Sequence, residues 1–553
     1  MDSRGKERTG RPGATGSQEV GVQETNIVME GNTEPGSPTS GCTQDLCLNA
    51  FIVALNETCD GKRWCTSTKE LQLVSLEFCM ACRNFPTLWL NVDAQIPHRL
   101  LAAAGTPPRR SKRLSSTRVP RLKARSVKWN IPTAAGLKQP IFALTEVDYI
   151  RFGDAFKGRL EAFAWSRRLK WIQFDRSSPF NKPIERVSWP ASLEGLQFPS
   201  NFNQPIEGVK WPASMKCIWF GAGFNQPIER VAWPTLLQEL AFEDDFNQPI
   251  EEVVWPASLQ SLTFDGAFDH PIERAAFPRS LEKIIFGEKC SFNQPIDRVV
   301  WPESLQEMEF GEAFNHSLEG VRWPATLEGL IFWGEFVDPL KLVSWPPSLQ
   351  ALQFLGRVHQ ALEGVVWPPS LECLTLGNGF NGPIEEVSWP DSLKNLEFGD
   401  QFNQPIEGVV WPVSLENLTL GNGFNAPVEG VSWPDSLKNL EFGDQFNQPI
   451  ERVSWPRWLE NLEFGDNFNK PIERVSWPDS LEHLMFGNTF NQPIERVMWP
   501  EVLKYLSLGD DFNQQVKEVC WPVVFTGLTV GRKFKHSTAE VWWPPWFEGV
   551  CQR

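Results

Sequence analysis

The sequence predicts a mainly β solenoid of about 17 to 18 coils with a 22-residue period and one short parallel strand in each coil. The first reason is a unit, FNQPIERVSWPRWLENLEFGDN at 446–467, which returns in similar form at 402–423, 468–489 and 490–511. The second is that insertions occur at one place in the unit. The third is that two prolines per unit disfavour a long helix. Self-similarity at one short period decides the fold class before local propensity does.

The repeat can be followed by the Phe that opens each unit. Successive starts are 22 residues apart, except for two steps of 24 residues. Both insertions fall between the second apolar run and the next Phe, so we expect them in a surface turn. A weaker copy begins at Leu137, and the segment WWPPWFEGV reads as a truncated closing coil. The starts are Phe156, Phe180, Phe202, Phe224, Phe246, Phe268, Phe292, Phe314, Phe336, Val358, Phe380, Phe402, Phe424, Phe446, Phe468, Phe490, Phe512 and Phe534.

Each coil is predicted to contain one short strand. The run Leu459-x-x-Leu462-x-Phe464 ends with the alternation of a strand, and Gly465 follows it at a turn where we expect a positive φ. Burial of the apolar side chains of a single coil does not offset the entropy lost by ordering its 22 residues. The coils must therefore stack, and each position of the unit becomes a column of equivalent residues.

Two of these columns are predicted to be structural. One holds a Trp followed by Pro, and the other holds the Asn that follows the opening Phe. Indole rings at coil spacing can stack, and an amide at a turn can satisfy backbone groups of its own and the adjoining coil. The alternative for the first column is an exposed aromatic stripe that binds sugars or bases. Members of the two columns include Trp389, Trp411, Trp433, Trp455, Trp477, Asn403, Asn425, Asn447 and Asn469.

A third column varies in chemistry and is the candidate partner-binding surface. It is the residue between the last two apolar positions of the predicted strand, together with a mixed polar column two residues earlier. Both columns point away from the core, and the alternative is a solvent face without a partner. The candidates are Trp219, Glu309, Gln353, Thr375, Glu397, Thr419, Glu441, Glu463, Met485 and Tyr505.

The repeat resembles known families. Leu459-x-x-Leu462-x-Phe464-x-x-Asn467 resembles the strand signature of leucine-rich repeats, and the FN-x-P-I…WP-x-SL-x-x-L-x-FG unit is similar to the FNIP repeat. The resemblance covers Leu137 to Pro545 and implies a curved solenoid that binds proteins along a concave parallel sheet. The chain departs from the leucine-rich pattern in two ways. The signature Asn is often replaced, and Trp stands before Pro where Leu or Ile is usual, which implies a wider coil.

The N-terminal part is predicted to divide into three regions before the solenoid of 129–553. Residues 1–41 are rich in Gly, Ser, Thr, Pro and charge and should be disordered. Residues 42–97 form a small Cys-containing region. Residues 98–128 form a basic linker, in which 107–114 is a possible nuclear-import signal. No apolar segment follows the first basic residues, so we expect no secretory signal and an intracellular protein, cytoplasmic or nuclear.

The six cysteines between 42 and 82 match no standard zinc module. Reduced thiols in a helical domain, zinc and disulfides remain open. The text CRNFPTLWLNVD faintly resembles the end of an F-box, a module to which FNIP-type repeats are often attached. This resemblance implies a second function, substrate recognition for ubiquitin ligation.

No motif predicts catalysis. The six His stand at unrelated positions, and no phosphate-binding Gly loop or nucleophile with a His partner is present in the sequence. We therefore expect no catalytic residue, cofactor or metal site. The formal net charge of -16 disfavours nucleic acid as the partner of the solenoid, and no apolar stretch is long enough to span a membrane. The expected function is a non-catalytic, monomeric solenoid that binds a protein; the alternatives are the ubiquitin-ligase adaptor and carbohydrate binding.

Overall fold

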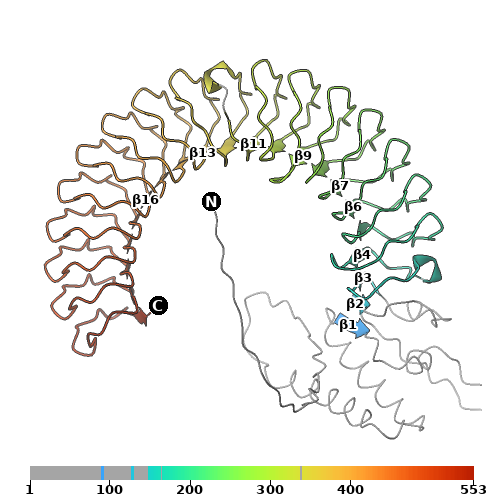
Figure 1. The fold of residues 1–553 in the computed structure, drawn as a ribbon. Helices are drawn as coiled ribbons and strands as arrows, with labels where there is room; N and C mark the ends of the chain where they lie inside the picture. The colour runs from blue at the N-terminus through green and yellow to red at the C-terminus, as the bar shows by residue number, and fades with distance from the viewer. Residues whose placement is uncertain (1–88, 93–125, 130–146, 164, 337–338, 553) are drawn as a thin grey trace, which may run out of the picture.

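The chain forms a single stacked solenoid bent into an open arc (Figure 1). The computed structural model describes residues 89–92, 126–129, 147–163, 165–336 and 339–552. In this part of the chain the strands line the inner side of the arc and the remaining backbone of each coil forms the outer side. The predicted fold class is confirmed.

One 21-stranded sheet runs through the described residues, and each strand pairs in parallel with the next strand along the chain. Two short 3-10 helices, η1 (Leu160–Ala162) and η2 (Leu340–Leu342), lie outside it. The strands are β1 (Trp89–Val92), β2 (Ser126–Trp129), β3 (Tyr149–Phe152), β4 (Trp171–Phe174), β5 (Gly195–Gln197), β6 (Cys217–Phe220), β7 (Glu239–Phe242), β8 (Ser261–Phe264), β9 (Lys283–Phe286), β10 (Glu307–Phe310), β11 (Gly329–Phe332), β12 (Ala351–Phe354), β13 (Cys373–Leu376), β14 (Asn395–Phe398), β15 (Asn417–Leu420), β16 (Asn439–Phe442), β17 (Asn461–Glu463), β18 (His483–Met485), β19 (Tyr505–Ser507), β20 (Gly527–Val530) and β21 (Gly549–Gln552).

The sheet begins earlier than the sequence pattern predicts. Strand β1 lies within 42–97, β2 overlaps the end of the predicted linker 98–128, and both pair in parallel within the same sheet. A four-residue strand without flanking Phe-Asn and Trp-Pro elements carries too little pattern to be recognised. Several predictions for the N-terminal part concern residues outside the described ones. They are the disordered tail 1–41, the six cysteines between 42 and 82, the F-box-like segment apart from its last residues, and the basic segment 107–114. The adaptor hypothesis therefore stays a prediction from the sequence.

The core is one continuous cluster built from the apolar columns of the unit. In most strands the second and fourth residues are buried and the first and third are more exposed, as alternation predicts. In the coil that opens at Phe446, six of the predicted apolar side chains are at most 5% exposed and Trp455 packs partly buried against them; the six are Phe446, Ile450, Val453, Leu459, Leu462 and Phe464.

The curvature follows from the width of the aromatic columns. Strands in a sheet lie about 4.8 Å apart. The ring centroids of Phe464 and the next coil's strand Phe are 5.4 Å apart, those of Phe446 and Phe468 are 6.0 Å apart, and those of Trp455 and Trp477 are 6.2 Å apart. Because the coils are held further apart by these rings than by the strands, the stack bends around its strand side.

The glycine that follows many of the strands has a different role from the one predicted. Gly465 is not among the glycines with positive φ in the described residues. A Cβ built at Gly465 would lie 2.3 Å from the carbonyl oxygen of Gly443 in the preceding coil. Glycine is therefore required by the close approach of two backbones, and this contact between coils cannot be read from one unit.

The two insertions are only partly surface turns. Arg176 and Ser177 of the first are exposed, but Ser178 is fully buried and its hydroxyl donates a hydrogen bond of 3.0 Å to the carbonyl of Phe156. In the second insertion Cys290 is 1% exposed, and its sulfur lies 3.6 Å from the carbonyl oxygen of Phe268. Each insertion thus returns a small polar side chain to a carbonyl of the preceding coil.

The concave strand face as a candidate interaction site

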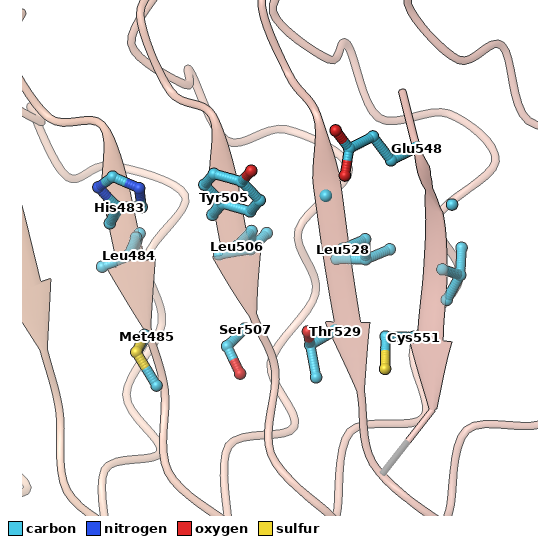
Figure 2. A pocket seen from close by; sticks show the side chains of 13 residues that line it. His483, Leu484, Met485, Tyr505, Leu506, Ser507, Leu528, Thr529, Glu548 and Cys551 are labelled. Carbon is cyan, nitrogen blue, oxygen red and sulfur yellow. The ribbon is translucent and has the colours of Figure 1, made fainter. Parts of the chain in front are cut away.

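Two columns of side chains cover the concave face. They are the first and third residues of each strand, and strand pairing keeps them in register from coil to coil. Figure 2 shows the C-terminal end of this face, where His483 and Tyr505 continue one column and Met485, Ser507, Thr529 and Cys551 continue the other. The intervening Leu484, Leu506 and Leu528 belong to the core.

The structure brings the predicted partner-binding residues onto this one surface. Tyr505 stands in the first-residue column, and the other nine stand in the third-residue column. Glu397, Glu441, Glu463 and Tyr505 are exposed. The remaining six are partly exposed, namely Trp219, Glu309, Gln353, Thr375, Thr419 and Met485.

An aromatic cluster occupies the N-terminal end of the face. The rings of Trp171 and Trp219 meet edge to face with centroids 5.3 Å apart. Trp171 covers Gly195, where an added Cβ would lie 1.9 Å from the indole. Tyr149 donates a hydrogen bond to Gln173. The sequence analysis missed Trp171 and Tyr149 because they stand near the irregular start of the array, although an aromatic residue at the first strand position was a usable signal.

The centre of the face is mixed in character. The indole N–H of Trp333 donates a hydrogen bond of 2.7 Å to the Oε1 of Glu309. This hydrogen bond restricts the side chain of Glu309, one of the predicted partner-binding residues. Ile285 and Ile331, in the same column as Glu309, flank it on the two neighbouring strands.

The region from β14 to β17 combines an amide ladder with a row of carboxylates. Asn417, Asn439 and Asn461 each donate a side-chain hydrogen bond to the Asn of the preceding strand. Glu397 and Glu441 accept long contacts of 3.4 Å from the hydroxyls of the Thr residues on their preceding strands. The amides therefore form a neutral hydrogen-bonded row beside the row of Glu carboxylates.

Lysines border this region but are already paired. Lys394 and Lys438 lie just before β14 and β16, and their ammonium groups are 2.9 Å and 3.0 Å from carboxylate oxygens of Glu372 and Glu416. The hydrogen bond from Lys394 to Glu372 raises the pKa of this lysine above its usual value. These cations are therefore engaged at the border of the sheet.

A depression of about 570 Å³ lies at the C-terminal end of the face (Figure 2). The rings of His483 and Tyr505 are stacked with centroids 5.1 Å apart, and Tyr505 is 44% exposed. The next two positions of this column are Gly527 and Gly549, and a Cβ added at Gly549 would meet nothing within 4 Å. The Tyr505 ring covers Gly527, where an added Cβ would lie 2.8 Å from it, so the open ledge lies beyond the ring at Gly549.

The Trp column is packed as the structural interpretation predicts. Neighbouring indoles stack with centroids 6.1 to 6.4 Å apart at Trp389, Trp411, Trp455 and Trp477. Their Nε1 atoms are buried without a hydrogen-bond partner in the described part of the chain, and Phe277 takes the same register. The rings are therefore held for packing, and their burial contradicts the alternative of an exposed sugar-binding stripe.

The Asn column connects adjacent coils. The side-chain Oδ1 of Asn403 accepts the backbone N–H of Asn425 at 2.8 Å, and Asn425 and Asn447 repeat this contact with Asn447 and Asn469 at 2.9 and 3.1 Å. In one coil Asp269 replaces the Asn and accepts the same bond at 2.9 Å. One side-chain oxygen per coil thus connects each turn to the turn of the next coil by a hydrogen bond.

Several histidines also serve these turns. His270, His316 and His536 stand where other coils carry Gln, and their Nε2 atoms lie 3.0 to 3.2 Å from the Asn carbonyl of the preceding coil. Gln448 makes the equivalent contact at 2.9 Å. Within the described residues no group of three or more His, Cys, Asp or Glu could hold a metal ion. No helix among them has the length and apolar character needed to cross a membrane.

The single parallel sheet and the stacked, buried Leu and Phe columns define a solenoid of the leucine-rich-repeat type. The family model of the FNIP repeat matches residues 224–266, 246–289, 380–423, 424–455, 446–489 and 490–522. The chain therefore contains FNIP repeats over these residues, which confirms the resemblance of its repeat unit.

A solved structure agrees with this class. The crystal structure of CroV588, described as a novel circular LRR protein, is 36% identical with a TM-score of 0.61, and the match covers 73% of this chain and 66% of that chain. The chain thus spans slightly under two thirds of the length of CroV588. An internalin (inlF) from Listeria monocytogenes is 15% identical (TM-score 0.35; 54% of this chain and 82% of that chain). The mouse RP105/MD-1 complex is 13% identical (TM-score 0.39; 75% and 84%). No match was found among curated protein sequences.

Proposed function

We propose that the chain is a non-catalytic interaction solenoid whose concave strand face binds a partner protein. The observation that carries the proposal is the contrast between columns. The buried columns and the Asn turn repeat with little change, because every coil must fit the next one. The outward strand column changes from Trp219 to Glu309, Thr419 and Met485, although the backbone beneath it stays the same.

The face also has the composition of a binding surface. Trp and Tyr residues, which are enriched among the residues that dominate interface energy, lie at both ends of it. The curved sheet presents these side chains toward the inside of the arc, where a partner can contact several coils at once (Figure 1). The structural contacts made by His270, His316 and His536 support a role without catalysis.

Site-specific photo-crosslinking tests the face. A photoreactive phenylalanine analogue is placed in the full chain at Thr419 on the concave side, or at Glu429 in an exposed turn outside the sheet. The proposal predicts a discrete crosslinked protein from the position-419 variant and a much weaker product from the position-429 variant. Equal products at both positions, or a product at 429 alone, would show that the concave face is not the binding surface.

A further inference from the structure

The C-terminal part of the concave face, from β14 to β21, carries carboxylates but no Lys or Arg at its first and third strand positions. In the described residues, no Lys or Arg forms an ion pair with Glu397 or Glu441. Glu441 and Glu463 are direct partners on neighbouring strands. Like charges placed directly opposite each other destabilise a sheet, and the same column elsewhere holds Gln, Thr and Ile.

A second row of carboxylates follows the ends of the same strands. Asp400, Asp444 and Asp466 stand two residues after the last core residue of the strand, and none of them forms an ion pair with a Lys or Arg in the part of the chain described. The lysines on the opposite border are held by the glutamates of the preceding coils, as for Lys394 and Lys438. The three aspartates accept hydrogen bonds from the Nδ2 of Asn422 and from the backbone N–H groups of Asp466 and Asn488. Together with Glu397 and Glu441 they form an acidic strip in which, within the described residues, none of these five carboxylates is paired with a Lys or Arg.

The acidic strip continues into the aromatic depression. One face of the Tyr505 ring is stacked on His483, the ring also covers Gly527, and the ledge at Gly549 lies beyond it. Figure 2 shows Tyr505 and Glu548 on either side of the strand that carries Leu528 and Thr529. A flat cation in this depression could stack on Tyr505 and approach the carboxylate of Glu548. An arginine guanidinium has this shape, and it also binds carboxylates through two parallel hydrogen bonds.

The spacing of the carboxylates fits an extended chain. Glu397 and Glu441 are two strands apart, which is about 9.6 Å at about 4.8 Å per strand. Three residues of a peptide in the extended polyproline II conformation span about 9 Å and complete one turn, so side chains three residues apart point the same way. Arginines three residues apart on such a peptide would reach these two carboxylates in turn while the peptide runs along the arc.

We propose that the face from β14 to β21 binds an extended, arginine-bearing segment of the partner protein, with guanidinium groups at Glu397 and Glu441 and one against Tyr505. This inference rests on the proposed function and specifies the chemistry of the partner. Charge complementarity selects the occupant: an acidic or neutral segment would leave the carboxylate rows unpaired or add to their repulsion.

The test uses the full chain and a labelled peptide that has arginine at every third position, separated by Gly and Ser. Fluorescence anisotropy should show binding that weakens as salt is added, and the same peptide with glutamine in place of arginine should bind much more weakly. The concave variant, Glu397→Gln with Glu441→Gln and Glu463→Gln, should lower the affinity roughly tenfold. Glutamine is already accepted in this column at Gln353, so the variant is expected to fold.

A matched control removes the same charge from exposed turns of nearby coils. It carries Glu407→Gln, Glu429→Gln and Glu451→Gln, and it should change the affinity less than about twofold. Equal losses in the two triple variants would overturn the proposal, because they would show attraction to net charge alone. Tyr505→Ala in the wild-type chain should also weaken peptide binding. An unchanged affinity would show that no guanidinium group binds at the depression.

Two other outcomes count against the proposal. If substitution of the chain's own basic residues Arg109, Arg110, Lys112 and Arg113 by Ser strengthens peptide binding severalfold, the occupant is the chain's own segment and the assignment to a partner is wrong. If the wild-type chain does not bind the peptide while crosslinking at position 419 persists, the partner has different chemistry. In that second case the proposed function stands and only this inference fails.

Discussion

Substitution of Gly465 by Ala tests how closely the coils must approach. The new Cβ would lie 2.3 Å from the carbonyl oxygen and 2.4 Å from the carbonyl carbon of Gly443. Because the obstacle is backbone on both sides, the two coils must separate locally by several tenths of an ångström. Overpacking of this kind costs about 1 to 3 kcal/mol. We expect Gly465→Ala to lower the denaturant midpoint of the full chain and to raise hydrogen exchange in the peptides around 443–465.

Gly208 provides the matched control. It has no positive φ, and an added Cβ would meet only the side chain of Glu185, at 3.6 Å. Gly208→Ala should therefore be neutral or stabilise the chain by up to about 1 kcal/mol, because it restricts the unfolded state. If the two substitutions lower the midpoint equally, close approach between the coils is not the reason for the glycine column.

Three further perturbations separate the roles of the columns. Trp455→Ala should destabilise the chain by about 3 to 5 kcal/mol, and Trp455→Phe by less than half of that, because the indole N–H has no partner to lose; equal losses in denaturation experiments would contradict this. Asn447→Asp should retain stability, since Asp269 already fills this role, whereas Asn447→Leu should cost about 1 kcal/mol in the same assay, and equal stability of both variants would argue against the turn acceptor. Burial raises the pKa of Cys217 to about 12, so at pH 8 its alkylation, followed by peptide mass spectrometry, should be at least about tenfold slower than that of exposed Cys520; similar rates would show that Cys217 is open to solvent.

The repeat made many side-chain positions readable without a structure. Leu462 and Phe464 are buried and Glu463 is exposed, as the alternation predicts, because each coil meets the same neighbours. Gly465 shows where one unit was insufficient: its sequence context suits a turn with positive φ, but a contact between coils decides its role. The predicted insertion turn likewise missed Ser178, whose buried hydroxyl reaches a carbonyl of another coil.

For the candidate site, the sequence identified the variable column but not the distinct regions along it, such as the acidic part and the depression beside Tyr505. It placed Glu441 and Glu463 next to each other in that column, since the period makes them neighbours. It did not show that Lys438 on the border is bound by Glu416, or that Gly549 leaves a ledge beyond the Tyr505 ring on the concave face. Those features depend on side-chain directions across adjacent coils.

The sequence by itself determined the 22-residue winding, the columns that form the core and the outward column in which the chain is free to vary. These follow from repetition, because each copy must satisfy the same contacts and the common residues reveal them. Only the tertiary structure decided the curvature of the stack, the start of the sheet at β1 and the depression beside Tyr505. Such features arise between coils, from ring spacing and backbone approach, and no single unit contains both partners of these contacts.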